Sequence, residues 1–127
     1  MGRERALQAP GRSGRMDPEL NFLETEMNRG FLQLLVLVAL EKKMYGYGMI
    51  KHLEETGYAV EENTLYPLLR RLEKNGWIKS EWDVSDDRPK KYYAITDQGR
   101  AVREQALTMW AKQTDIINAM KGVDRDA

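Results

Sequence analysis

The chain has 127 residues, a length that suits one domain with a modest core, and its 20 basic and 20 acidic side chains give a formal net charge of zero. The absence of cysteine excludes disulfides and thiol nucleophiles, and a single histidine leaves little for a metal site or a catalytic relay, so we expect no cofactor and no metal. The longest apolar run, Phe31 to Leu40, is too short to span a bilayer, which predicts a soluble, cytoplasmic protein without membrane association.

The first segment, residues 1–15, differs in composition from the rest of the chain. It holds four arginines, three glycines and a proline among few apolar residues. This composition indicates a disordered leader or a remnant of expression. A basic arm that touches DNA is the alternative, but no aromatic or periodic residues accompany the arginines.

The next two segments predict helices. From Asn28 to Lys43 apolar residues occupy two sides of a helix, which therefore needs two packing partners. One side carries Leu32, Leu35, Val36 and Ala39, and the other carries Leu34 and Val38. After a glycine-rich break at residues 44–48, a shorter helix is predicted up to Thr56 and Gly57.

A third helix has the clearest periodicity in the chain. Its leucines recur at i, i+3, i+4 and i+7, and they are Leu65, Leu68, Leu69 and Leu72. Because Pro67 lacks an N–H and suits a first turn, we expect the N-cap at Asn63 or Thr64 and the helix end at Asn75 and Gly76.

A hairpin follows the third helix. Alternation predicts a strand from Trp77 to Val84, strand-forming residues predict a second strand at 91–95, and the turn lies at 85–89. Thr96 is expected to cap a long helix that runs to about Lys121 and ends at Gly122.

This order of elements predicts an α+β, mainly helical chain: a winged helix-turn-helix, with three helices and a two-stranded wing, followed by a long dimerisation helix. The corresponding divisions are a winged-helix unit with its N-terminal helix at 16–96, the C-terminal helix at 97–121 and a tail at 122–127.

The candidate DNA-binding residues lie on the third helix and the wing. At 100° per residue the side opposite the leucines is cationic and hydrogen-bonding, and arginine and asparagine can read base edges while lysine, tyrosine and threonine commonly hold phosphate. The candidates are Asn63, Thr64, Tyr66, Pro67, Arg70, Lys74, Arg88, Lys90 and Lys91. A solvated helix face is the alternative, and Asp86 and Asp87 dilute the charge of the wing.

Three segments together resemble the PadR family, and the resemblance covers about Asn28 to Lys121. They are Tyr45-Gly46-Tyr47-Gly48, the run from Asn63 to Glu73, and Lys90 to Thr96 with Gly99 and Arg100. The resemblance implies a homodimeric repressor that binds a palindromic promoter, with Thr64, Tyr66 and Arg70 at positions that meet DNA and the wing cations beside them.

The predicted C-terminal helix carries a broad apolar stripe that has no partner within so small a monomer. Pairing it with the first helix of a second subunit would bury both, so we expect a homodimer. The candidate dimerisation residues are Leu34, Val38, Val102, Met109, Ile116 and Met120.

Trp110 on the same helix is a candidate ligand-binding residue. Near a two-fold axis it could stack a planar aromatic ligand against its own copy, and an ordinary interface tryptophan is the alternative. The helix around it resembles that of short, multidrug-sensing PadR-like regulators, which implies a dimer pore for a small aromatic or drug-like effector. The candidate effector residues are Ala106, Trp110, Gln113, Thr114 and Ile117. Asp115 lies about 140° from Trp110 around the helix, so the charge preference of the ligand stays open.

Other residues have structural interpretations. We expect His52 on the surface, Trp77 and Trp82 on the core or the wing root, and one of Tyr92 and Tyr93 in the core. A winged-helix module that binds small molecules or proteins but not DNA is the alternative function. An enzyme is not expected, because no nucleophile, base and orienting group share a catalytic spacing and no phosphate-binding loop is present.

Overall fold

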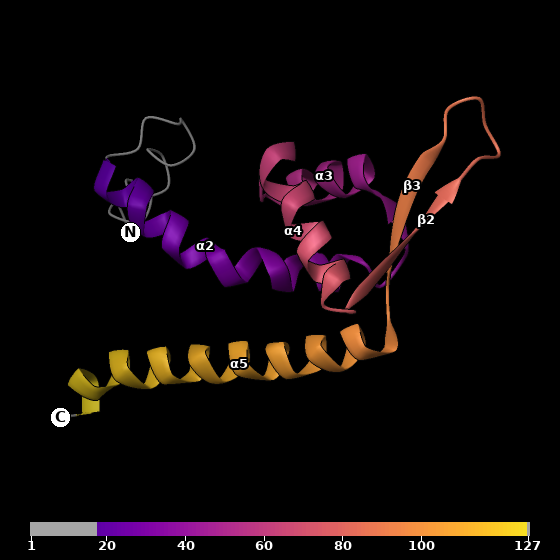
Figure 1. Ribbon diagram of the computed structural model, residues 1–127. Helices are drawn as coiled ribbons and strands as arrows, with labels where there is room; N and C mark the ends of the chain where they lie inside the picture. Colours follow the sequence, from indigo (N-terminus) through magenta and orange to yellow (C-terminus); the bar gives the residue numbers. More distant parts are fainter. Residues whose placement is uncertain (1–17, 127) are drawn as a thin grey trace. The chain divides into compact units, whose positions relative to one another are not determined.

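The computed structural model describes residues 18–126, and the leader expected at residues 1–15 lies outside this range. The elements in chain order are α2 (Pro18–Ala39), β1 (Met44–Tyr45), α3 (Gly46–Glu55), α4 (Glu62–Lys74), β2 (Ile78–Asp83), β3 (Lys90–Ile95) and α5 (Asp97–Asp126) (Figure 1). The predicted order of three helices, a hairpin and a long helix is confirmed. Within the described part of the chain, no helix is both long and apolar enough to cross a membrane.

Two compact units divide the chain between Leu32 and Gln33, inside α2. In the first unit the helix begins at Pro18, well before the predicted start at Asn28. Pro18 suits a first turn because it needs no amide partner there, and the carboxylate of Glu19 is favourable at a helix N-terminus. Polar residues interrupt the apolar pattern of this stretch, which is why periodicity alone missed it.

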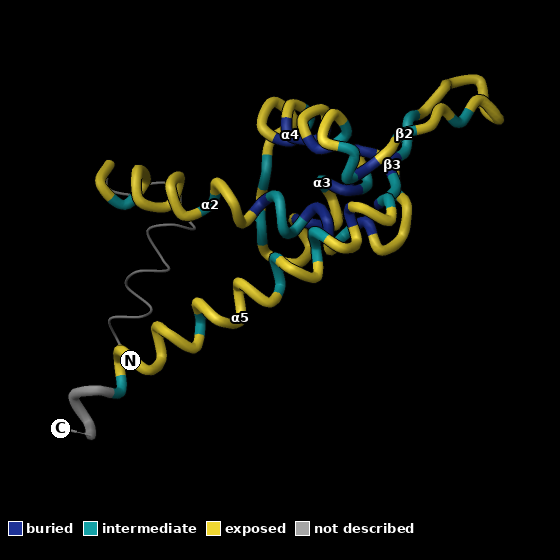
Figure 2. Tube along the Cα trace, turned by 60° about the horizontal axis from the view of Figure 1, so that its bottom comes forward, coloured by how far each residue is buried: buried dark blue, intermediate teal, exposed yellow. Residues whose placement is uncertain are grey.

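The core of the second unit is built from leucines of α4 and apolar residues of the elements around them. The periodicity of α4 is confirmed, because all four of its leucines are buried and the opposite side is exposed (Figure 2). The buried apolar residues of this unit are Val36, Leu37, Leu40, Met49, Leu53, Leu65, Leu68, Leu69, Leu72, Ile78, Tyr93 and Ile95.

The sheet has three antiparallel strands in the order β1-β3-β2. In the wing, β2 pairs with β3 from Ile78 opposite Ile95 to Asp83 opposite Lys90. The two-residue strand β1 was not predicted, and it pairs with the other edge of β3 at residues 92–93. This pairing ties the chain that enters α3 to the base of the wing.

Glycines end both helices of the helix-turn-helix. Gly57 and Gly76 have positive φ angles of 104° and 84°. After Gly76 the amide of Trp77 donates to the carbonyl of Leu72, and the amide of Gly76 donates to that of Glu73, which is a Schellman motif. The predicted end of α4 is therefore confirmed.

The predicted start of α4 is wrong. Its N-cap is Glu61, which makes no side-chain capping bond, so the helix begins ahead of the expected caps Asn63 and Thr64. Pro67 consequently lies inside the helix, in its second turn. There a proline removes one amide donor, the one that would otherwise bond the carbonyl of Asn63, and the buried leucine face outweighs that single loss.

The start of α5 is fixed by Thr96, as predicted. Its hydroxyl oxygen accepts a hydrogen bond from the amide of Gly99 at 3.0 Å, and its hydroxyl donates to the carbonyl of Gly76 at 2.6 Å. The helix continues to Asp126, so the expected end near Lys121 and Gly122 is wrong.

Two other contacts hold the first turns of α5 on the second unit. Gly99 is buried against the backbone of Trp77, with no room for a side chain. The guanidinium of Arg103 bonds Glu41, in the turn after α2, and Glu104 on its own helix. Two carboxylates raise the pKa of Arg103, chiefly through the hydrogen bond that Arg103 donates to Glu41.

The wing aromatics divide differently from expectation. Tyr93 is buried and Trp77 is half-buried, but Trp82 is 64% exposed and does not cover the core. Trp82 shares the strand face of Ile78, yet it lies farther along β2, beyond the end of the core. His52 is exposed on α3, as predicted.

Candidate nucleic-acid interface

The outer face of α4 is polar because its inner face is fully used by leucine packing. Asn63, Thr64, Pro67, Arg70 and Lys74 are all exposed. These are five of the six candidates that the sequence placed on this helix, and they share one side. The face combines an amide, a hydroxyl and two cations, groups that can donate to base edges and phosphates.

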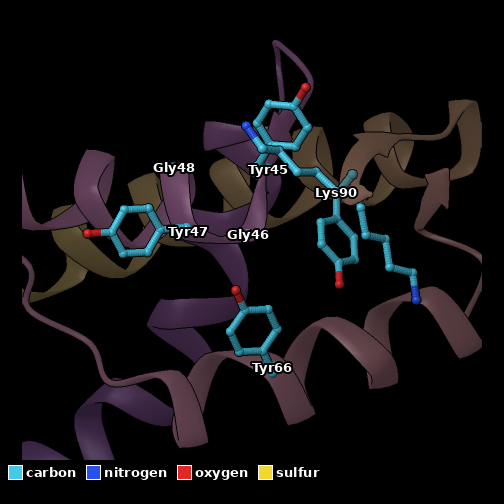
Figure 3. Close-up of a pocket in the computed structure, with 8 residues that line it drawn as sticks. Tyr45, Gly46, Tyr47, Gly48, Tyr66 and Lys90 are labelled. Atoms are coloured by element: carbon cyan, nitrogen blue, oxygen red, sulfur yellow. The ribbon is translucent and has the colours of Figure 1, made fainter. Parts of the chain in front are cut away.

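Tyr66, the sixth candidate on α4, is only half-buried and turns toward α3. An added Cβ at Gly46 would lie 2.6 Å from the Tyr66 hydroxyl and 2.7 Å from the ring, so the side chain passes directly against the glycine (Figure 3). Burial raises the pKa of Tyr66, and the charge of Glu62 adds to this shift. Tyr66 thus joins the two helices of the helix-turn-helix instead of projecting with its neighbours.

The three candidate cations of the wing occupy different positions. Arg88 is exposed in the turn, and Lys90 and Lys91 lie at the start of β3. The ammonium of Lys90 lies 5.2 Å from the ring centroid of Tyr45, and that of Lys91 lies 5.6 Å from the centroid of Trp82. Such cation–π contacts place a charge without neutralising it.

A hydrogen-bonded contact near the turn of the wing was not foreseen. The hydroxyl of Tyr45 donates to Asp83 at 2.7 Å, and the hydroxyl of Ser85 also donates to Asp83 at 2.7 Å. These bonds lower the pKa of Asp83 to about 2, and the bond from the Ser85 hydroxyl contributes most. The hydrogen bond to Asp83 in turn raises the pKa of Tyr45. The contact joins β1 to the end of β2.

A cleft of about 590 Å³ opens between the start of α3, the middle of α4 and strand β3 of the wing (Figure 3). We name it the tyrosine cleft. Its lining residues are Tyr45, Gly46, Tyr47, Gly48, Tyr66, Lys90, Lys91 and Tyr93. Three of them, Tyr66, Lys90 and Lys91, were candidate DNA-binding residues, and the others were not, although Tyr45 to Gly48 had stood out as a motif. Sequence spacing could not show that these distant segments share one cavity.

The electrostatics of the cleft include a residue of the outer face of α4. Tyr93 has a raised pKa, principally through burial, with further increases from Tyr66 and Glu73. The charge of Arg70 acts in the opposite direction on Tyr93. Tyr66 lines the cleft and Arg70 follows it by one helical turn, so the cleft and the outer face adjoin.

The candidate effector and dimerisation residues lie mostly on α5. Its outer part is exposed in the single chain, with Trp110 at 52%, Met109 at 56% and Met120 at 69% of full exposure. Ile116, Ile117 and Gln113 are also exposed, whereas Val102, Ala106 and Thr114 are half-buried. On α2, Leu34 is half-buried and Val38 is exposed. The predicted apolar stripe is thus present as an open surface.

Comparisons with known proteins converge on one family. A family model described as "Transcriptional regulator PadR-like family" matches residues 34–105. A transcriptional regulator of Mycobacterium tuberculosis is 38% identical over 77 residues, 60% of this chain and 72% of that protein. The crystal structure of a PadR family transcriptional regulator from Eggerthella lenta is 38% identical with a TM-score of 0.75, covering 82% of this chain and 93% of that chain.

A more distant structure shares the fold. Bacillus subtilis PadR, whose crystal structure contains operator DNA, is 24% identical with a TM-score of 0.56. The likeness covers 61% of this chain and 45% of that one. The family match includes the outer face of α4, the wing and the tyrosine cleft, whereas Trp110 lies beyond it.

Proposed function

Because this chain belongs to the PadR-like family of transcriptional regulators, we propose that it binds operator DNA as a homodimer and represses transcription. The observation that carries the proposal is the outer face of α4, where two cations, an amide and a hydroxyl lie exposed beside the wing. The proposed action takes place in the cytoplasm and includes no catalytic step.

The proposed contacts follow from the chemistry of each side chain. Arg70 can bond a guanine edge with two donors, and Asn63 can do the same with adenine. Thr64 and Lys74 suit phosphate oxygens, while Pro67 offers an apolar surface on the same side. The wing cations Arg88, Lys90 and Lys91 suit the phosphates beside the groove.

The proposed dimer is supported by the exposed apolar stripe of α5. An apolar surface of this extent is costly in water, and a second copy provides the matching surface. In the proposed dimer two α4 helices enter successive major grooves, about 34 Å apart. The same arrangement places two copies of Trp110 on one interface, where a planar aromatic or drug-like effector can stack.

The first test is DNA binding. Labelled duplexes of the region upstream of the gene, or duplexes selected from a random pool, are titrated and followed by fluorescence anisotropy at two salt concentrations. We expect sequence-preferring binding that weakens steeply with salt. Arg70→Ala should weaken it by roughly 5- to 100-fold and relax the preference at one base position.

The matched control for Arg70→Ala is Lys112→Ala, which removes one exposed cation from α5 instead of α4. It should leave DNA affinity within about twofold of the original. If neither selection nor the upstream region yields a preferred sequence, the DNA-binding proposal is wrong, and a winged-helix module that binds other partners takes its place.

The second test concerns the dimer and its effector. Ile116→Asp places a charge in the exposed stripe and should shift the mass measured by light scattering from dimer to monomer. A planar aromatic ligand should quench the fluorescence of the original protein and leave that of Trp110→Phe unchanged. If such a ligand binds without altering DNA affinity, it is not an effector, because coupling between two sites must be reciprocal.

A further inference from the structure

The tyrosine cleft has a charge pattern that suits an anion. Two of its lining residues, Lys90 and Lys91, are cations, and none of the lining residues is acidic. Asp83, the carboxylate that contacts Tyr45, already accepts bonds from the hydroxyls of Tyr45 and Ser85. Asp83 stays ionised and lies close enough to Lys90 to offset part of its charge, so the lining itself offers a net positive charge, chiefly that of Lys91, next to aromatic surface.

The walls of the cleft are aromatic, which indicates more than a bare anion. Tyr45, Tyr47, Tyr66 and Tyr93 all contribute to the lining. A single phosphate would occupy only a small part of about 590 Å³ and would leave these rings unused. A ligand that carries an apolar ring next to its anionic group matches the whole surface, and a deoxyribose joined to its phosphate is such a group.

The position of the cleft indicates that the sugar–phosphate unit comes from the backbone of bound DNA. It lies between α4, whose outer face carries the candidate base contacts, and the wing, whose cations suit phosphate (Figure 3). A DNA backbone that borders the groove occupied by α4 must pass on this side of the helix. Tyr47 is 63% exposed at the opening, so its ring is accessible to the backbone.

We propose that the tyrosine cleft seats one sugar–phosphate unit of each operator half-site, a contact that fixes the register of α4 in the groove. Lys90, placed over the ring of Tyr45, bonds the phosphate, and Tyr47 packs against the deoxyribose. The inference rests on the proposed DNA binding and adds Tyr45 and Tyr47, from the start of α3, to the interface. Because these contacts involve the backbone alone, they contribute affinity and register but no direct base preference.

The test combines protein variants with neutralised phosphates. Each phosphate of the selected duplex is replaced in turn by a methylphosphonate, which removes the charge and keeps the sugar. With the original protein, several phosphates of each half-site should be sensitive, and replacement of the one seated in the cleft should weaken binding by about tenfold, the size of one charge-assisted contact. Because the homodimer loses this contact at both half-sites, Lys90→Met should bind the native duplex about 100-fold more weakly, and methylphosphonate at that same position should cost nothing further.

Two variants serve as controls, and one probes the sugar contact. Arg88→Met removes a wing cation that does not line the cleft. The affinity loss of this variant and the loss caused by methylphosphonate at the seated position should therefore multiply, as independent effects do. Lys90→Arg should retain most of the affinity. Tyr47→Ala should weaken all sequences by a similar factor, because the sugar carries no base information. Since Lys90 and Tyr47 are exposed, unchanged thermal unfolding is expected for both variants.

The outcomes separate this inference from the proposed function. The inference is wrong if the original protein binds DNA but every methylphosphonate weakens the binding of Lys90→Met by the same factor as that of the original protein. In that case Lys90 contacts no single phosphate and none lies in the cleft. If the original protein binds no DNA at all, the proposed function fails and the inference fails with it.

Discussion

Replacement of Gly99 by alanine tests whether the first turn of α5 is locked onto the wing domain. A Cβ at this position would lie 2.8 Å from Cγ1 of Ile95 and 2.9 Å from the carbonyl carbon of Trp77, and it would overlap the carbonyl oxygen of Trp77. Carbon contacts favour about 3.5–4.0 Å, so the helix and the strand must separate by about 1 Å. Because one obstacle is backbone, no side-chain rotation relieves the overlap.

The magnitude follows from what that separation disrupts. Overpacking costs about 1–3 kcal/mol. The same movement strains two neutral hydrogen bonds of the junction, from the Thr96 amide to Trp77 and from the Thr96 hydroxyl to Gly76, each worth about 1 kcal/mol. Alanine regains at most about 1 kcal/mol of helix propensity. We expect Gly99→Ala to lower the free energy of unfolding by about 2–4 kcal/mol.

The assay is thermal unfolding followed by circular dichroism at one fixed protein concentration, because the proposed dimer would unfold in a concentration-dependent way. A loss of that size should lower Tm by roughly 10–20 °C. Gly48→Ala is the matched control, since this helical glycine has nothing within 4 Å of an added Cβ, and it should leave Tm unchanged or higher. If Gly99→Ala unfolds at the same temperature as Gly48→Ala, α5 is not locked at this residue.

The remaining predictions concern three other local contacts. Gly46→Ala should destabilise the chain by about 1–2 kcal/mol, because its Cβ meets the Tyr66 ring, and the cost should largely disappear in a Tyr66→Ala background, as a double-mutant cycle in urea would measure. Thr96→Ala should lower the free energy of unfolding by about 1 kcal/mol through loss of the cap, whereas Thr96→Ser keeps the capping hydroxyl and should lose less. A Thr96→Ala chain as stable as the original would contradict this. Asp83 has a folded pKa of about 2, below its ordinary value of 3.8, so its stabilising contribution is present above pH 4 and is lost as the pH falls toward 2. The stability advantage of the original chain over Asp83→Asn should therefore shrink across that range in acid titrations, and an advantage independent of pH would refute the assignment.

Features that depend on neighbouring residues could be predicted from the sequence. The leucine spacing of α4 fixed both its buried face and its exposed polar face, which together supply most of the candidate interface. Gly76 and Thr96 were recognisable because helix ends have local chemical requirements. These signals lie within a few residues of the feature that they specify.

Features that depend on distant pairing could not be predicted. Strand β1 has only two residues, and its partners on β3 lie far along the chain. The contact between Tyr45 and Asp83 spans 38 positions and has no periodic signature. Tyr66 lies at the flank of the outer face by its rotation around the helix, and the absence of a side chain at Gly46 lets it turn toward α3.

Some predictions failed because a local rule was weaker than packing. Pro67 is tolerated in the second turn of α4, since the loss of one hydrogen bond is small beside the burial of four leucines. Trp82 follows the alternation of its strand correctly but lies where the core has ended. Alternation predicts which face a side chain occupies, not how far the neighbouring layer extends.

The locked junction at Gly99 makes α5 a lever arm. With 30 residues the helix is about 45 Å long, so a rotation of about 5° at the junction displaces its far end by about 4 Å. The C-terminal end of α4 lies at the same pivot, through the bond between Thr96 and Gly76, and its first turn is only about 20 Å away. The same rotation moves that turn by less than about 2 Å. A movement at the far end of α5 is therefore reduced by more than half at the first turn of α4. The remaining displacement is still large enough to break a hydrogen bond between that turn and a bound partner.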